Sequence, residues 1–96
     1  MKAAYRFRIP HDVTLIIRGL HPDLQSKVRT AFGLLAHDAH AGKALRAELE
    51  GLRTLRAGRF RIIYRLRARR VIGIVAVGPR ERIYEETLRL LKNSPG

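Results

Sequence analysis

The stretch RFRIIYRLR, residues 59–67, carries two kinds of side chain in alternation. Successive side chains of a β-strand point to opposite faces, so this pattern predicts a strand with one apolar and one basic face. The apolar row comprises Phe60, Ile62, Tyr64 and Leu66, and the basic row comprises Arg59, Arg61, Arg65 and Arg67. Four like charges on one face repel one another, which raises the question of which anion they bind.

The residues around this strand predict a series of antiparallel strands joined by short turns. LRTLR (52–56) is typical of a strand, and the Ala-Gly pair at 57–58 of a tight turn. ARR (68–70) predicts a second turn, and VIGIVAVG (71–78) is apolar throughout. A continuous apolar run indicates a central strand that is covered on both faces.

The remaining segments predict one more strand and three helices. YRFRI (5–9) alternates like a half-buried strand, and Asp12 is a suitable N-cap for an amphipathic helix that ends before the His-Pro pair at 21–22. A second helix is predicted from 22 to about 37, and a third follows Pro79, over 80–92.

The element order β-α-α-β-β-β-α predicts an α+β fold in a single domain spanning residues 1–96. We expect an antiparallel sheet of about four strands, with an N-terminal helical hairpin and a C-terminal helix packed over one face. Residues 37–45 are predicted to form a loop. The open face of the sheet would carry the arginines.

The charge of the chain favours an anionic partner. The net charge is +12, sixteen of the twenty basic residues are arginine, and residues 51–80 contain nine arginines and no acid. Arginine presents a planar fork of donors that suits phosphate. Nucleic acid and an acidic protein are the leading candidates and an anionic membrane is the third; the plain alternative is a solvated basic surface.

Several classes of protein are disfavoured. The chain has no cysteine, so disulfides and thiolate chemistry are excluded. It has no apolar stretch of the roughly 20 residues that span a bilayer, and the N-terminal MKAAYRFRIPHD has no signal-peptide core. We therefore expect a cytoplasmic protein. His37 and His40 lack further ligands at suitable spacing, so a metal site is not expected, nor is a cofactor.

Three segments resemble the RelE/ParE family of toxins from type II toxin–antitoxin systems. They are LRAELEGL (45–52), LRAGRFRIIYR (55–65) and VGPRERIY (77–84). RelE-like members cleave mRNA in the ribosomal A site, whereas ParE-like members inhibit DNA gyrase and need no nuclease residues. The resemblance therefore implies a bacterial or archaeal toxin of one of these two kinds, bound by a cognate antitoxin, and the RelE-like activity is our first hypothesis.

The resemblance also implies a set of site residues. Arg61, Arg80 and Tyr84 match the positions of the RelE-like nuclease motif. Two lysines of that motif are absent, because Leu52 and Thr54 stand in their places. The implied reaction needs no metal: a ribose 2′-OH attacks the adjacent phosphorus and leaves a cyclic phosphate and a 5′-OH.

Further basic residues are candidates to hold RNA backbone or an antitoxin carboxylate. They are Lys43, Arg46, Arg53, Arg56, Arg59, Arg65, Arg67 and Arg82. Phe60 and Tyr64 alternate with arginines and could stack on bases, but they point away from Arg61, so we expect them to pack in the core. The implied partners are the antitoxin and the ribosome with its mRNA, with DNA gyrase as the alternative; a third hypothesis is an RNA-binding protein without toxicity.

Overall fold

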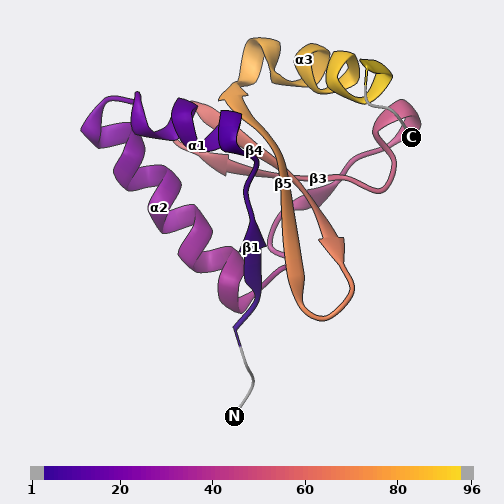
Figure 1. Cartoon of the computed structure of the whole chain (residues 1–96), viewed down its shortest axis with the longest axis horizontal. Helices are drawn as coiled ribbons and strands as arrows, with labels where there is room; N and C mark the ends of the chain where they lie inside the picture. The colour runs from indigo at the N-terminus through magenta and orange to yellow at the C-terminus, as the bar shows by residue number, and fades with distance from the viewer. Residues whose placement is uncertain (1–3, 94–96) are drawn as a thin grey trace.

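The computed structural model describes residues 4–93, so residues 1–3 and 94–96 of the predicted domain lie outside the described part. Its elements, in chain order, are β1 (Arg6–Arg8), α1 (His11–Arg18), α2 (Pro22–His37), β2 (Lys43–Ala44), a 3₁₀ turn (Ala47–Leu49), β3 (Arg53–Ala57), β4 (Phe60–Arg67), β5 (Val71–Pro79) and α3 (Arg80–Asn93). Figure 1 shows α1 and α2 together on one side of the sheet, with α3 apart from them.

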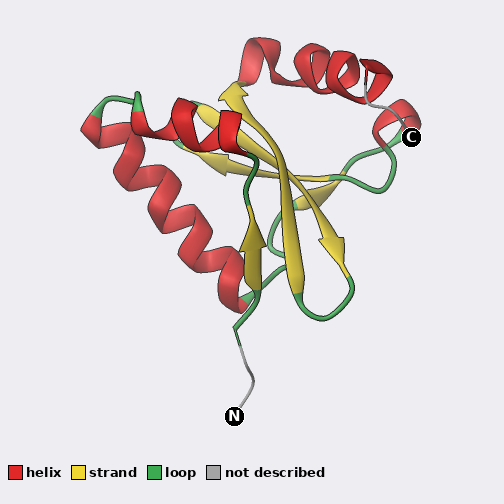
Figure 2. Ribbon diagram, in the orientation of Figure 1, coloured by secondary structure: helices red, strands yellow, loops and turns green. Residues whose placement is uncertain are grey.

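The strands form one five-stranded sheet in the order β1-β5-β4-β3-β2 (Figure 2). The predicted series β3-β4-β5 is confirmed, and β5 is central between β4 and β1. Two details differ from the prediction. β1 pairs parallel to β5, because the chain crosses over through α1 and α2 before it returns to the sheet. The predicted loop contains β2, whose two residues are too few to show any periodicity.

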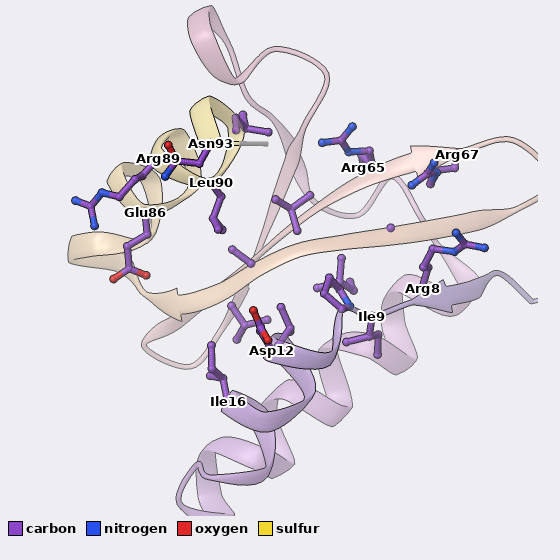
Figure 3. Close-up of a pocket in the computed structure, with 18 residues that line it drawn as sticks. Arg8, Ile9, Asp12, Ile16, Arg65, Arg67, Glu86, Arg89, Leu90 and Asn93 are labelled. Atoms are coloured by element: carbon purple, nitrogen blue, oxygen red, sulfur yellow. The ribbon is translucent and has the colours of Figure 1, made fainter. Parts of the chain in front are cut away.

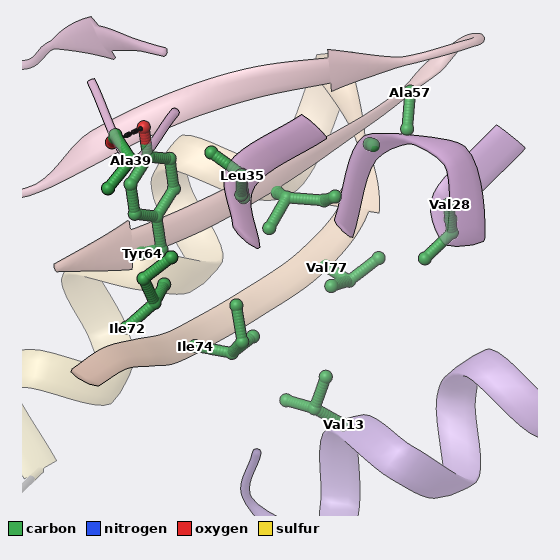
Figure 4. Close-up of a cluster of buried hydrophobic side chains, with 11 residues drawn as sticks. Val13, Val28, Leu35, Ala39, Ala57, Tyr64, Ile72, Ile74 and Val77 are labelled. Carbon is green, nitrogen blue, oxygen red and sulfur yellow. Dashed lines mark hydrogen bonds between the residues drawn. The ribbon is translucent and has the colours of Figure 1, made fainter. Parts of the chain in front are cut away.

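The larger core lies between the sheet and helices α1 and α2 (Figure 4). The apolar row of β4 faces this core as predicted: Ile62 and Tyr64 are fully buried, and Phe60 and Leu66 pack at its edge. The Tyr64 hydroxyl donates to the carbonyl of Ala39 (2.9 Å) and accepts from the N–H of Gly42 (3.1 Å). Tyr64 is therefore a core residue that also holds the 39–42 segment against the sheet.

A second, smaller core lies on the other face, under α3. Its buried members are Leu49, Leu52, Ile63, Ala76 and Ile83. The prediction that all helices cover one face is wrong for α3, because Ile63 and Ala76 interrupt the basic side of the sheet and give α3 an apolar surface on which to pack.

A register shift in the β4–β5 ladder makes this two-sided burial possible. Ile63 pairs with Ala76 and Tyr64 with Ile74, so Val75 has no partner in β4. The extra residue is a β-bulge, which lets Val75 and Ala76 both reach the α3 core while Ile74 faces the α2 core. The apolar run of β5 is thus covered on both faces, as its composition predicts.

Candidate nucleic-acid interface

The sheet face opposite α1 and α2 carries a row of basic side chains. Strand alternation places seven of them there, and we call this set the basic face: Arg6, Arg8, Lys43, Arg56, Arg61, Arg65 and Arg67. Side chains alternate along a strand, and the neighbours of these residues in β1, β3 and β4 pack in the α2 core. Lys43 lies on the same face because it pairs with Thr54, which also points away from that core. α3 covers only part of this face, so arginines remain accessible on both sides of it.

One group of arginines gathers where the β3–β4 hairpin meets the start of α3. Arg56 of β3 is the cross-strand partner of Arg61 in β4, and Arg61 is in turn the partner of Gly78 in β5. The backbone N–H of Arg80 donates to the carbonyl of Arg59 (3.4 Å), which brings the hairpin turn to the first residue of α3. We call Arg56, Arg59, Arg61 and Arg80 the hairpin cluster.

The hairpin cluster has an uncompensated positive charge. Among the described residues, none of its four guanidiniums forms an ion pair with a carboxylate. The Arg56 Nε donates to the carbonyl of Gly58 (3.0 Å), which fixes that side chain along the turn and leaves its other donors available. The positive end of the α3 dipole adds to the same field, because the helix begins at Arg80. This arrangement favours an oxyanion.

Arg53 does not share this face. It pairs with Tyr64, so its side chain lies on the side of α2, and its Nη2 donates to the carbonyls of Gly42 (2.6 Å) and His40 (3.1 Å). Its Nε is buried without a hydrogen-bond partner in the described residues. The structure therefore places Arg53 apart from the other predicted RNA-binding residues and ties it to the 40–42 backbone.

The other predicted RNA-binding residues lie around the basic face without joining the hairpin cluster. Lys43 pairs with Thr54 at the edge of the sheet, and Arg46 is exposed just before the 3₁₀ turn. Arg82 is exposed in the first turn of α3. Arg65 and Arg67 occupy the opposite end of β4 from Arg61.

The third predicted catalytic residue, Tyr84, lies one helical turn after Arg80 on the same side of α3. Its ring is half-buried and packs against the second core. The positions that correspond to the missing lysines are both buried: Leu52 belongs to the second core, and the Thr54 hydroxyl has no hydrogen-bond partner in the described residues. Neither side chain can act as a general acid for a substrate.

Two basic residues of this face were not among the predicted site residues. Arg6 and Arg8 alternate with Tyr5 and Phe7, which indicates a basic side of β1. The sequence left open whether β1 joins the sheet at an edge or beside the central strand, so these arginines could not be assigned to one site with Arg65 and Arg67. The alternation of basic and apolar residues in β1 is visible in the sequence, but the pairing of β1 with β5 joins segments that are far apart in the chain.

Residues 4–93 contain neither a metal site nor a membrane-spanning helix. No group of three His, Cys, Asp or Glu side chains within residues 4–93 is arranged to hold a metal ion, and His37 and His40 are exposed. In the same range, every helix is too short or too polar to span a bilayer.

Comparison with known proteins identifies related chains. A family model described as the ParE toxin of the type II toxin–antitoxin system parDE matches residues 11–84. A chain of the toxin–antitoxin complex RelBE2 from Mycobacterium tuberculosis is 30% identical, with a TM-score of 0.69 over 80% of this chain and 99% of that one. No curated protein gives a match.

Two more distant structures share the fold. The archaeal RelE–RelB complex from Pyrococcus horikoshii OT3 contains a chain that is 22% identical, with a TM-score of 0.66 over 82% of this chain and 98% of that one. A double arginine-to-alanine mutant of E. coli RelE in the free state is 17% identical, with a TM-score of 0.71 over 95% and 99%. The family match, the 30% identical relative and the shared fold agree with one another. The chain belongs to the RelE/ParE family of toxins from type II toxin–antitoxin systems.

Proposed function

We propose that this toxin is a ribosome-dependent mRNA endonuclease that arrests translation without a metal ion. The observation that carries the proposal is the hairpin cluster, in which Arg61 and Arg80 lie at the same end of the sheet without carboxylate partners in the described residues. Phosphate is the ligand that such a set of guanidinium forks suits best. A cytoplasmic location follows from a ribosomal substrate.

The proposed reaction is an internal displacement at phosphorus. A ribose 2′-oxygen forms a bond to the adjacent phosphorus as its proton passes to a water molecule, and the bond from phosphorus to the 5′-oxygen breaks as that oxygen takes a proton from water. The products are a 2′,3′-cyclic phosphate and a 5′-OH, so atoms and charge balance. Arg61 and Arg80 stabilise the negative charge that develops on the phosphorane oxygens, and preorganised donors of this kind often supply the largest part of a rate enhancement.

The proton transfers rely on weaker groups. We assign Tyr84 the role of orienting the nucleotide or stacking on a base. Because Leu52 and Thr54 are buried and a guanidinium does not release its proton, water protonates the leaving 5′-oxygen. We therefore expect slower cleavage than in a relative that carries lysines at these positions.

A cognate antitoxin is the second proposed partner. The structures of RelBE2 and of the archaeal RelE–RelB pair are of toxin–antitoxin complexes. By analogy, we propose that a small protein with an acidic segment covers the basic face of this chain. Charge complementarity supports this, since the net charge of the toxin is +12.

A gyrase-directed inhibitor is the alternative function. Two observations favour it: the family model is that of ParE toxins, and the general-acid positions are filled by Leu52 and Thr54. In that case the arginines would bind a protein surface, and no phosphodiester would be cut.

Cleavage on purified ribosomes programmed with a defined mRNA separates the two functions. We expect codon-positioned cuts with the wild type and a loss of about 10²–10³-fold in rate for Arg61→Ala or Arg80→Ala, the usual cost of removing one transition-state donor. Arg29→Ala is the matched control, because Arg29 is exposed on α2, which covers the other face. Intact mRNA together with inhibition of DNA supercoiling by purified gyrase would refute the nuclease.

A further inference from the structure

We propose that four arginines at the far end of the sheet form a second phosphate-binding subsite, which holds the RNA strand away from the cleavage point. The four residues are Arg6 and Arg8 of β1 and Arg65 and Arg67 of β4, and we call them the arginine quartet. The identity of the ligand rests on the proposed function; the existence of an oxyanion site there rests on geometry and charge.

The strand register brings the quartet together across β5. Gly73 is the partner of both Arg8 and Arg65, and Val71 is the partner of both Arg6 and Arg67. Neighbouring strands lie about 4.8 Å apart, so the two arginines of each tier have Cα atoms separated by about 10 Å. The tiers follow each other after two residues, or about 6.6 Å along the strands. The quartet is therefore two successive pairs of guanidiniums, all on the basic face.

Gly73 forms the floor between the two strands. A Cβ atom at this position would lie 3.1 Å from Cδ of Arg67 and 3.4 Å from Cγ of Arg65. The stems of both arginines therefore lean over β5 from the side of β4, toward the strand that carries Arg8. A glycine leaves the space that this approach requires.

Three members of the quartet, Arg8, Arg65 and Arg67, line a groove of about 1050 Å³ between α1 and α3, whose floor is β5. In Figure 3, Arg65 and Arg67 project from one side of β5 and Arg8 lies on the other. The groove also contains the carboxylates of Asp12 and Glu86, but neither forms an ion pair with an arginine in the described residues. The charge of the quartet is thus uncompensated, and holding these side chains together is unfavourable unless an anion binds.

The groove follows β5 away from the quartet. Its floor runs along β5 from Gly73 to Val77, and the next residue, Gly78, is the partner of Arg61. Along β4, Arg61 and Arg65 are four residues apart, or about 13 Å. The carboxylates of Asp12 and Glu86 line the groove beyond the quartet, so an RNA strand would place its phosphates at the quartet rather than beside them.

These features favour RNA over an acidic protein as the occupant. The quartet consists of arginine alone, and between its side chains lie only Gly73 and the small side chain of Val71. Two tiers of planar donors, one after the other, match successive phosphates of an extended strand. An acidic protein segment is the competing occupant, and the binding measurements below distinguish it from RNA.

Binding of a fluorescent single-stranded RNA to the purified full-length chain tests the proposal. We expect Arg65→Ala/Arg67→Ala and Arg6→Ala/Arg8→Ala each to weaken binding at least about tenfold and to lower the slope of log affinity against log salt by about 1. Arg18→Ala/Arg29→Ala removes the same charge from exposed positions on α1 and α2 and should change affinity less than about twofold.

Two further variants test the geometry without changing the charge. Gly73→Ala should weaken binding several-fold, because its Cβ displaces the arginine stems. Arg65→Lys/Arg67→Lys should restore only part of the affinity, because lysine lacks the planar fork. Thermal unfolding of each variant shows whether the fold is retained, and variants that unfold at the assay temperature are compared at a lower one.

The outcomes separate this proposal from the nuclease itself. If the wild type binds RNA through the quartet but does not cut mRNA on ribosomes, the subsite stands and the nuclease fails. If cleavage is confirmed, quartet variants should raise the RNA concentration for half-maximal rate and keep the maximal rate. Equal losses in the quartet and control variants, or unchanged RNA binding with lost affinity for an acidic antitoxin peptide, would overturn the proposal.

Discussion

Arg53 is a basic residue of the kind that binds RNA, but its contacts in this protein are structural. Its Nη2 donates to two backbone carbonyls, those of His40 and Gly42, in the segment that Tyr64 also holds. Hydrogen bonds from a charged donor stabilise more than neutral ones do. Arg53 and Tyr64 therefore fasten the segment between α2 and β2 to the sheet, and the charge of Arg53 serves this purpose.

We predict that Arg53→Ala lowers the free energy of unfolding by about 1–3 kcal/mol, because two carbonyls lose a charged donor. Urea unfolding measures this change, and Arg29→Ala, an exposed substitution on α2, should stay within about 0.5 kcal/mol of the wild type. RNA affinity should be unchanged at temperatures where the variant is folded. A variant with normal stability and weakened RNA binding would contradict this prediction and show that Arg53 contacts RNA.

At the scale of elements, two glycines have opposite roles. Gly42 lies buried between α2 and β2, where an added Cβ would be 2.5 Å from the carbonyl oxygen of Thr54 and 2.6 Å from the Tyr64 hydroxyl. Gly33 is exposed within α2, and an added Cβ there would meet nothing within 4 Å. The first glycine lets the chain pass close to β3, whereas the second only weakens its helix.

We predict that Gly42→Ala destabilises the protein by about 1–3 kcal/mol, because backbone and a buried hydroxyl must shift. Gly33→Ala should stabilise it by about 0.5–1 kcal/mol, because alanine favours the helix. Thermal unfolding of the two single variants side by side measures both signs. Similar changes in both would contradict the close approach at Gly42.

At the scale of the whole molecule, positive charge greatly exceeds negative charge. The net charge is +12, and no arginine of the basic face forms an ion pair with a carboxylate of the described residues. Like charges therefore oppose the compact state until salt or a polyanion screens them. A tightly bound acidic partner would stabilise this toxin both through its contacts and by neutralising its field.

We predict that raising NaCl from about 0.05 M to about 0.5 M increases the melting temperature, because the Debye length falls well below the spacing of the arginines. A gain of about 0.5–1 kcal/mol would correspond to roughly 2–8 °C for a domain of this size. Inorganic polyphosphate at constant ionic strength should raise it too, since it binds the basic face. A melting temperature that falls with salt would show that unrecognised ion pairs dominate.

The amount that the sequence could predict differs between the fold and the site. The strands and helices between residues 52 and 92 follow from alternation and helical spacing, which are local, and Arg61 and Arg80 were singled out by motif resemblance. The side of the sheet on which α3 packs does not follow from the sequence, because the isolated apolar residue Ile63 on the basic side gives no periodic signal. The parallel β1–β5 pair and the Val75 bulge depend on partners far apart in the sequence.

The sequence by itself determined that residues 59–67 form a strand with an apolar and a basic face, because a period of two depends only on neighbouring residues. It also determined an uncompensated basic charge, which is a matter of composition. Only the tertiary structure decided which arginines share a site. Strand pairing set Arg6 and Arg8 across Gly73 from Arg65 and Arg67, and it set Arg53 opposite Tyr64, on the α2 side of the sheet, where its guanidinium reaches the 40–42 backbone. Both depend on contacts between distant segments, and these form only when the sheet is assembled.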